Sequence, residues 1–355
     1  MVTTFSELRG QARPAEPALF DSSAVVRTFD TPEFRGVTFY EVEAKSLINR
    51  VPNAANLPFE WTVNVYRGCS HACKYCFARP THTFLGFDAG RDFETRVVVK
   101  VNAAEVLRRE LRKPSWTGQH IAMGTNTDPY QRCEGRYRLT RSVLEVLAEA
   151  RNPCSVLTKS PLLTRDLDVM VELNKTAGFA AALSIGTLDE EVWRRTEPGT
   201  PHPRARIEAV RTLNEAGIPC GVLVAPVLPG ISDRPDQLRE VVTAAVDAGA
   251  THVSGITLHL RPGVKEEFLP WLDATYPELS ETYRRMYRGA NAPRRVQSAI
   301  SACIAAATVK ARGTAAPPAR PNHRETPERG TRPKQKQQPS SPRRSPGPSQ
   351  LQLSF

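Results

Sequence analysis

The residues best suited to chemistry are three cysteines, Cys69, Cys73 and Cys76, which lie within eight consecutive residues. Their spacing, C-x3-C-x2-C, lets one loop hold a small iron–sulfur cluster by three thiolates. The fourth corner of such a cluster has no protein ligand. An iron left open in this way can bind a substrate or cofactor directly, whereas a cluster held by four cysteines only carries electrons. The spacing therefore predicts an iron–sulfur centre with an open coordination site.

A structural zinc loop is the alternative interpretation, with His71 or His82 as a fourth ligand beside the three thiolates. Structural zinc sites usually combine two separated C-x2-4-C pairs, and the sequence has no second pair. His71 also lies between the first two cysteines, where its reach to a shared metal is awkward. A disulfide is less favoured still, because nothing marks the chain as secreted. The cluster is the favoured hypothesis.

The aromatic residue directly before the last cysteine, Tyr75, completes a pattern that resembles the signature of the radical S-adenosylmethionine (radical SAM) enzymes. In that family three cysteines hold a 4Fe-4S cluster, and the open iron binds the amino and carboxylate groups of S-adenosyl-L-methionine (SAM). An electron donor such as flavodoxin or ferredoxin reduces the cluster, and SAM is cleaved to a 5'-deoxyadenosyl radical. The resemblance therefore implies a 4Fe-4S cluster and SAM as cofactors.

The elements that must position the cysteines alternate between strand-like and helical patterns from Trp61 onwards. Strands are predicted at 61–66, 120–123, 155–158, 180–185, 221–225 and 252–258, and helices at 103–112, 139–151, 164–176, 204–216 and 237–248. This alternation predicts an α/β fold, a partial (β/α)6 TIM-type barrel with right-handed crossovers. The carboxyl ends of the strands then meet on one face, and the cysteine loop follows the first strand as that rule requires.

The chain is expected to divide into three parts. Residues 1–55 are interrupted by prolines and predict an irregular N-terminal extension, with 37–42 as its one short strand candidate. Residues 56–310 form the core, which includes two Arg-rich helical patterns at 278–287 and 294–310.

The third part, residues 311–355, is predicted to be a disordered, basic, Pro-rich tail. It carries nine Arg and Lys against two Glu, which is +7 of the net charge of +11. Residues 312–350 contain no Val, Ile, Leu, Met, Phe, Tyr or Trp, so they cannot bury enough apolar surface to offset the entropy of ordering. The positive charge favours a polyanionic partner, although a solvated linker has the same composition.

The sequence also predicts a cytoplasmic protein with no membrane segment. Seven cysteines are an odd number, and the four outside the loop are scattered singly, which suits a reducing compartment. The first ten residues lack the apolar run of a signal peptide. No apolar stretch reaches the roughly 18 residues that a spanning helix needs.

Polar side chains follow several predicted strands. Gly124-Thr125-Asn126-Thr127-Asp128-Pro129-Tyr130 follows the second strand, Lys159 follows the third, Ser184 lies at the end of the fourth and Val224-Ala225-Pro226 at the end of the fifth. One such residue is usually an ordinary loop residue. Because four polar strand ends converge on one cluster, cofactor contacts become an equally good interpretation.

The order of these stretches, together with Arg195-Thr196-Glu197-Pro198-Gly199-Thr200, resembles spore photoproduct lyase and its wider family over about residues 56–260. That family repairs a thymine dimer in DNA by radical hydrogen abstraction, so the resemblance implies DNA as the partner. By position it implies SAM contacts from Lys159 and Ser184, and a further polar contact from Asn126.

The chain departs from that family at the hydrogen donor. The lyase uses a cysteine at the end of the second strand, where this chain has Gly124. Cys133 is the candidate replacement, unless it is an ordinary loop thiol, and Tyr66, Tyr75 or Tyr130 could relay a hydrogen atom or simply pack. The prediction is a lyase-like radical SAM enzyme acting on DNA. The alternatives are a radical SAM enzyme acting on RNA, protein or a small molecule, and a non-catalytic, metal-stabilised adaptor.

The last six residues contain large apolar side chains again after the long polar tail. Gln350, Leu351, Leu353 and Phe355 form a Q-L-x-L-x-F pattern that resembles the peptides by which bacterial polymerases and repair proteins bind the DNA sliding clamp. In a disordered tail such a trio is either a binding motif or chance. A linker of about 40 residues has a root-mean-square reach of roughly 35 Å. The pattern therefore predicts the sliding clamp as a partner that tethers the core near DNA.

Overall fold

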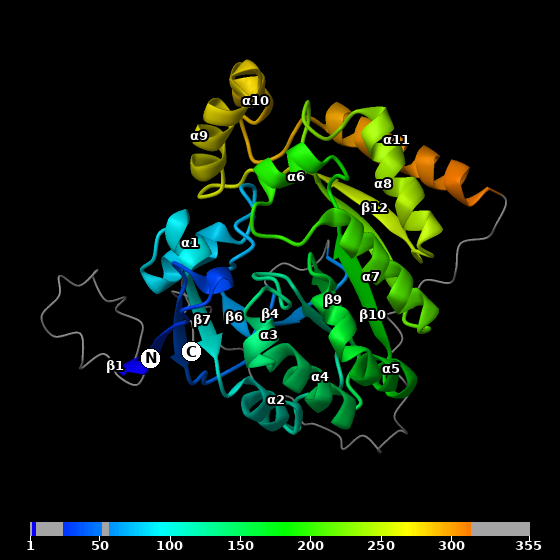
Figure 1. Cartoon of the computed structure of the whole chain (residues 1–355). Helices are drawn as coiled ribbons and strands as arrows, with labels where there is room; N and C mark the ends of the chain where they lie inside the picture. The colour runs from blue at the N-terminus through cyan, green and yellow to red at the C-terminus, as the bar shows by residue number, and fades with distance from the viewer. Residues whose placement is uncertain (1, 5–23, 52–56, 314–355) are drawn as a thin grey trace, which may run out of the picture.

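The structure, a computed structural model, describes residues 2–4, 24–51 and 57–313 and contains two sheets (Figure 1). The larger sheet has seven strands in the order β12-β11-β10-β9-β8-β5-β4. Its strands are β4 (Ile48–Arg50), β5 (Trp61–Val63), β8 (Ile121–Met123), β9 (Cys154–Thr158), β10 (Phe179–Ser184), β11 (Cys220–Val227) and β12 (Val253–Thr257). The pairs from β5 to β12 are all parallel, and only β4 runs antiparallel to its neighbour. The sheet confirms the predicted partial barrel of six parallel strands, with an antiparallel strand added at one edge.

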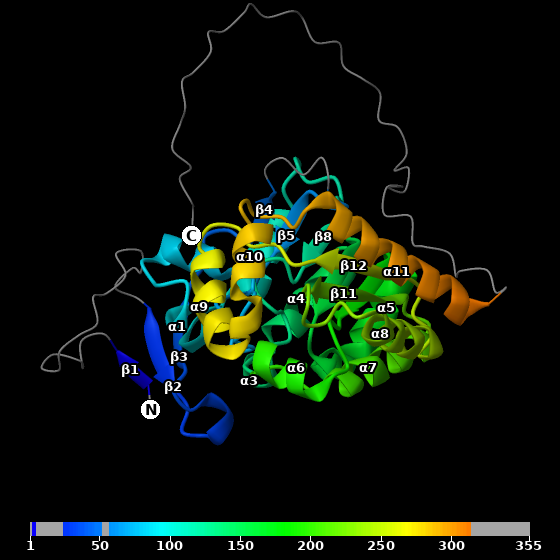
Figure 2. The ribbon, with the colours of Figure 1, turned by 90° about the horizontal axis from the view of Figure 1, so that it is seen from above.

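Helices connect the strands of this sheet and cover its outer face (Figures 1 and 2). The five predicted ones are present as α2 (Ala103–Leu111), α4 (Leu139–Glu149), α5 (Leu167–Thr176), α7 (Pro203–Glu215) and α8 (Pro235–Asp247). In α4 the buried side chains of Leu139, Val143 and Leu147 recur every four residues, which produces the apolar stripe that faces the sheet. Short helices precede two of them: α3 (Glu134–Tyr137) and α6 (Glu190–Thr196).

The N-terminal part differs from the predicted irregular extension. It contributes β1 (Val2–Thr4), β2 (Val25–Thr28), β3 (Thr38–Val42) and β4. The first three form a second sheet, in the order β1-β2-β3-β7-β6, with β7 (Arg96–Lys100) and β6 (Tyr66–Arg67). Between these last two strands lie a 3-10 helix (Arg79–Leu85) and α1 (Arg91–Thr95).

The predicted strand 61–66 is therefore divided between the two sheets. Its first half, β5, pairs with β8, whereas β6 pairs antiparallel with β7. Val97, Val98 and Val99 of β7 are buried, and β7 also pairs in parallel with β3. These pairings join segments that are distant in the sequence, so no local pattern revealed them.

The C-terminal part forms a helical cap and a long terminal helix. The cap consists of α9 (Lys265–Thr275) and α10 (Ser280–Met286), and α11 (Arg294–Arg312) follows it. Buried cap side chains such as Phe268 and Tyr283 belong to the same apolar cluster as Cys73 and Tyr75, so the cap packs against the cysteine loop. Helix α11 packs beside α8 and β12, as Figures 1 and 2 show.

No helix within the described ranges combines the length and the apolar character that crossing a bilayer requires. The predicted tail beyond residue 313 lies outside the described residues, and so does the predicted clamp peptide with Gln350, Leu351, Leu353 and Phe355.

Candidate active site

The cysteine loop, residues 68–77, follows β6 and is held at its start by two side chains from the segment after β8. Thr127 Oγ1 donates to Gly68 O at 2.7 Å, and Gln131 Nε2 donates to the same carbonyl at 3.1 Å. Gln131 Oε1 accepts the Ser70 N–H at 3.0 Å. A single glutamine amide thus fixes both sides of the first cysteine, Cys69.

The rest of the loop is held from two other directions. The buried Arg79 guanidinium donates to Cys73 O at 2.9 Å and to Gly90 O at 2.9 Å. On the opposite side, Gly199 N donates to His71 O at 3.0 Å. A Cβ at Gly199 would lie 2.2 Å from Ser70 O, so only glycine permits this close approach. Hydrogen bonds from surrounding protein groups therefore hold the loop in this conformation.

The donor set of this loop fits an iron–sulfur cluster. Cys69 and Cys73 are buried, Cys76 is half-buried, and all three are free thiols. Burial raises the pKa of all three thiols, and the negative charges of Asp128 and of the neighbouring thiolates raise the pKa of Cys69 further. A bound metal centre favours the thiolate form that burial opposes. Among the described residues, no three His, Cys, Asp or Glu side chains are arranged to hold a single metal ion.

Both histidines of the zinc hypothesis face other partners. His71 Nδ1 lies 3.4 Å from Asp128 Oδ2. His82 Nε2 lies 2.9 Å from Arg96 O, and its ring stacks on Phe87 with the centroids 5.0 Å apart. Even so, His71 Nε2 and His82 Nδ1 are buried without a hydrogen-bond partner. The assignment of Cys69, Cys73 and Cys76 as the ligand set stays a prediction.

Lys159 and Ser184, the two predicted SAM contacts, lie side by side at the carboxyl ends of β9 and β10. Lys159 Nζ donates to Ser184 Oγ at 2.6 Å and to Ala225 O of β11 at 3.3 Å. Ser184 Oγ in turn donates to Ala225 O at 2.8 Å. The register of β11 against β12 shifts between Val224 and Val227, and such an irregularity leaves a carbonyl like that of Ala225 to accept side-chain bonds. Three predicted strand ends are thus brought together, although their role toward SAM stays a prediction.

A buried carboxylate, Glu197, links this group to the cysteine loop. It accepts the Tyr75 hydroxyl, pairs with Arg206 Nη2 at 2.5 Å and lies 3.3 Å from Lys159 Nζ. Burial opposes the charge of Glu197, but Arg206 and Lys159 outweigh it and lower its pKa to about 2. Arg206 also donates to Ser184 O at 3.0 Å. The Tyr75 hydroxyl is therefore part of a buried ion-pair network, while its predicted role in hydrogen transfer stays a prediction.

Asp128 is a second carboxylate that connects the strand ends to the cysteine loop, on the other side of that loop. Its Oδ1 accepts the Thr158 hydroxyl at 2.6 Å, and its Oδ2 accepts Lys159 N at 2.7 Å. Burial alone would raise the pKa of Asp128, but the neighbouring His71 and these hydrogen bonds lower it. Asp128 and Glu197 lie within the strand-end stretches of the sequence, but no pattern there predicts their role, and Arg206 has no signal beyond its place in a helix.

Asn126 and Gly124 lie at the carboxyl end of β8. The Asn126 side chain is exposed, and its backbone N–H donates to Asn64 Oδ1 at 3.2 Å. Gly124 has a φ of +92°, and a Cβ added there would lie 1.9 Å from Leu157 O. A cysteine, or any other residue with a side chain, would fit here only if the Leu157 backbone moved.

Cys133 and Tyr130 are buried in the main core. Cys133 lies beside Tyr66, whose hydroxyl donates to Glu134. Tyr130 donates through its hydroxyl to Asp166 Oδ2 at 3.1 Å. Burial raises the pKa of Cys133 and that of Tyr130. These candidates belong to a polar network within the core, and Tyr130 N donates to Asp128 Oδ1 at 2.9 Å, the carboxylate that also accepts Lys159 N. Their roles in hydrogen transfer stay predictions.

Comparison with known proteins adds the family context. A family model described as the radical SAM superfamily matches residues 63–261, more than half of the chain. An uncharacterised protein of Mycobacterium tuberculosis strain H37Rv is 50% identical over 264 residues, which cover 74% of this chain and 78% of that protein. A Pseudomonas phage M6 protein named radical SAM Nalpha-GlyT isomerase is 26% identical over 185 residues, covering 52% of this chain and 36% of that protein.

Solved structures of spore photoproduct lyase share the fold. A mutant of that enzyme has a TM-score of 0.55 at 17% identity, covering 77% of this chain and 79% of that chain. Another mutant, with bound AdoMet and dinucleoside spore photoproduct, has a TM-score of 0.56 at 16% identity, covering 76% of this chain and 78% of that chain. At this identity the likeness concerns the fold alone.

Proposed function

The chain belongs to the radical SAM superfamily, and on that premise we propose that it is a radical SAM enzyme that acts on DNA. The superfamily uses a 4Fe-4S cluster and SAM as its cofactors. The observation that carries the proposal is the hydrogen bond of 2.6 Å between Lys159 and Ser184, at the strand ends that Glu197 connects to the cysteine loop. A cationic ammonium and a hydroxyl at this place suit the carboxylate and ribose groups of SAM.

In this proposal Cys69, Cys73 and Cys76 hold the cluster, and Lys159 and Ser184 orient SAM. When bound, the two cofactors together supply a 5'-deoxyadenosyl radical that removes a hydrogen atom from the substrate. The buried pairs around Glu197 and Asp128 keep the loop and the strand ends in a fixed relationship, which lowers the cost of ordering the site when the cofactors bind.

DNA is favoured as the substrate by two independent features. The predicted tail carries +7 of the net charge, which suits a polyphosphate. Proteins of the same fold include spore photoproduct lyase, one of whose structures contains the dinucleoside spore photoproduct. Because Gly124 stands where that enzyme has its cysteine donor, we expect a lesion or a base other than the spore photoproduct.

Anaerobic turnover with deuterated substrates tests this proposal. We expect deuterium to enter 5'-deoxyadenosine only with certain oligonucleotides from a panel of damaged and normal DNA. Transfer from RNA, a protein or a small molecule alone would instead support the alternative radical SAM substrate. If the purified protein contained zinc, lacked iron and left SAM intact after reduction, both enzyme hypotheses would fail. The non-catalytic adaptor would then be the supported function.

The hydrogen donor is tested in the same assay. Cys133 is the proposed thiol donor, with Tyr130 or Tyr75 as relay residues. A Cys133→Ala variant that still forms product would exclude the thiol. Its iron content and SAM cleavage provide the control that the site has remained folded.

We also propose the partners that this function requires. A low-potential donor such as flavodoxin or ferredoxin would reduce the cluster, and a reducing cytoplasm would keep the thiols available. The peptide with Gln350, Leu351, Leu353 and Phe355 would bind the DNA sliding clamp. Pull-down of the clamp by the full-length protein, but not by Leu353→Ala/Phe355→Ala, would support this partner; equal retention by both would exclude it.

A further inference from the structure

A cation from the sixth strand end, Arg261, reaches the edge of the cysteine loop. It follows β12, and its carbonyl accepts Val264 N at 3.0 Å in the turn that leads to α9. Its Cζ lies 5.9 Å from the ring centroid of Phe77, the residue after Cys76. Burial lowers the pKa of Arg261, and a nearby Cys76 thiolate opposes that shift. Arg261 therefore belongs to the mouth of the proposed site.

Arg261 differs from the other cations around the cysteine loop in its partners. Lys159 and Arg206 both pair with Glu197, and Arg79 pairs with Glu94. Arg261 Nε is buried, yet it has no hydrogen-bond partner among the described residues. The Arg261 side chain as a whole is half-buried, so its guanidinium stays accessible while the buried Nε–H lacks an acceptor. A buried donor without an acceptor costs free energy, and an anionic ligand would supply that acceptor.

The neighbouring ring supplies the second observation. Phe77 is 49% exposed although it directly follows a cluster ligand and belongs to a loop that is otherwise largely buried. An exposed aromatic face beside a guanidinium is the combination by which proteins bind single-stranded or unstacked nucleotides. The ring stacks on a base, and the guanidinium binds a phosphate through paired N–H donors.

We propose that Arg261 and Phe77 form the nucleotide-docking contact of this site, with Arg261 on a backbone phosphate and Phe77 on a base. This inference rests on the proposed function, since it specifies how a DNA strand would be held at the mouth. The competing explanation is that Arg261 only balances the charge of the cluster thiolates.

Salt-dependent binding of a fluorescently labelled single-stranded DNA oligonucleotide distinguishes the two explanations. The protein is used with its cluster loaded, under anaerobic conditions. Loss of one phosphate contact reduces the slope of log K against log salt by about 0.7 for a single strand. We expect that reduction in Arg261→Gln and the original slope in Arg261→Lys. Phe77→Ala should weaken binding about tenfold at an unchanged slope, because stacking releases no counterions.

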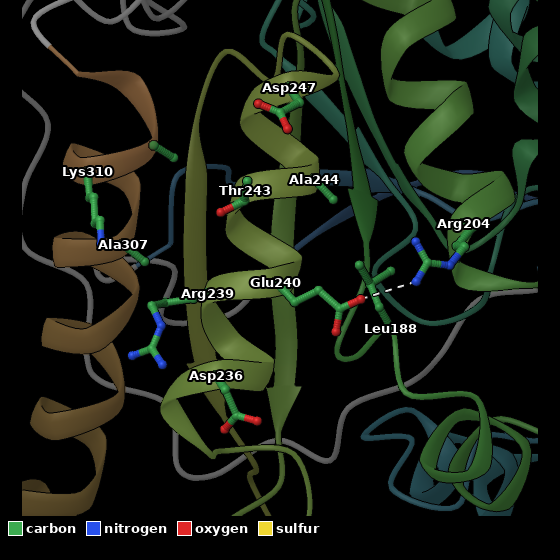
Figure 3. Close-up of a pocket in the computed structure, with 11 residues that line it drawn as sticks. Leu188, Arg204, Asp236, Arg239, Glu240, Thr243, Ala244, Asp247, Ala307 and Lys310 are labelled. Atoms are coloured by element: carbon green, nitrogen blue, oxygen red, sulfur yellow. Dashed lines mark hydrogen bonds and ion pairs between the residues drawn. The ribbon is translucent and has the colours of Figure 1, made fainter.

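The matched control is Arg204→Gln, which removes one charge from the outer face of the barrel. Arg204 pairs with Glu240 at 3.2 Å beside a surface hollow of about 680 Å³ between α7, α8 and α11 (Figure 3). The slope of log K against log salt for Arg204→Gln should equal that of the unsubstituted protein. Iron content and circular dichroism of each variant confirm that fold and cluster are intact.

Two results would overturn the inference in different ways. If Arg261→Gln kept the original slope and shifted the reduction potential of the cluster, Arg261 would serve the cluster and not the substrate. If the unsubstituted protein bound no oligonucleotide at all, the proposed function itself would fail, and the docking contact with it.

Discussion

Lys159 Nζ and Ser184 Oγ lie 2.6 Å apart, so residues from two neighbouring strands share one hydrogen bond at the carboxyl edge of the sheet. The two residues are 25 positions apart in the sequence, so the contact depends on the fold. The bond forms because β9 and β10 pair in parallel, with Thr158 opposite Leu183. The cofactor contacts that the sequence predicts are therefore adjacent only in the folded sheet.

Removing the ammonium group should weaken SAM binding without removing the cluster. We expect Lys159→Met to raise the Kd for SAM by roughly 10- to 100-fold, because a hydrogen bond to a charged group contributes about 1.5–3 kcal/mol. Glu197 keeps Arg206 as its partner in this variant, so the fold should persist. Equilibrium binding of SAM to the cluster-loaded protein provides the measurement.

The exposed Lys175 on α5 offers the matched control, because Lys175→Met removes the same charge away from the strand ends. Its SAM affinity should equal that of the unsubstituted protein. Unchanged affinity in Lys159→Met, with the iron content retained, would contradict the assignment of Lys159 as a SAM contact.

Each cysteine of the loop should be required for the cluster. In Cys69→Ala, Cys73→Ala or Cys76→Ala, two thiolates remain, and we expect iron to fall from about four atoms per chain to nearly none. Cys303→Ala is the control, because this thiol lies on α11, away from the loop. Iron analysis of anaerobically purified protein measures the effect. Full SAM cleavage by Cys73→Ala would contradict the ligand set.

Local pattern predicted those parts of the fold whose contacts follow from periodicity and strand order. The five crossover helices and the six parallel strands were found because each carries its own apolar pattern. The strand-end rule then placed Lys159 and Ser184 beside the cysteine loop. Apart from the parallel strand order, these elements depend on residues that are close together in the sequence.

The remaining features depend on pairings that no local pattern shows. Strand β3 pairs with β7 across more than 50 residues, and the two-residue strand β6 pairs with β7 on the other side. Arg206 occupies one position of an amphipathic helix with many arginines nearby, so its partner Glu197 could not be identified before the fold was known. The predicted strand 61–66 was divided for the same reason.

His82 should make folding stability depend on pH. Burial lowers its pKa to about 4, from an ordinary value of 6.5. Between these values the unfolded chain binds a proton that the folded chain does not, so the free energy of unfolding falls as the pH falls from 6.5 to 4. The change is on the order of 3 kcal/mol.

His82→Phe keeps a ring beside Phe87 and removes the titrating group. Loss of the bond to Arg96 O lowers stability equally at every pH. Urea unfolding from pH 4 to pH 7 should therefore show a weaker pH dependence in this variant than in the unsubstituted protein. Parallel curves for the two proteins would mean that His82 is not the titrating group.

Gly124 should resist replacement far more than a glycine of similar backbone conformation. At this position φ is +92° and an added Cβ would lie 1.9 Å from Leu157 O, whereas Gly118 has a φ of +84° with no atom within 4 Å of an added Cβ. Gly118→Ala should cost about 1–2 kcal/mol, the penalty of the left-handed backbone alone. Gly124→Ala should cost on the order of 3 kcal/mol or more, because the Leu157 backbone must also move. Urea unfolding of the two alanine variants measures the difference in stability. Gly124→Cys should be as unstable as Gly124→Ala, and it should gain no lyase activity on the dinucleoside spore photoproduct. Equal stability of the two alanine variants would show that the strand end can accommodate a side chain, and the absence of a cysteine there would then need another explanation.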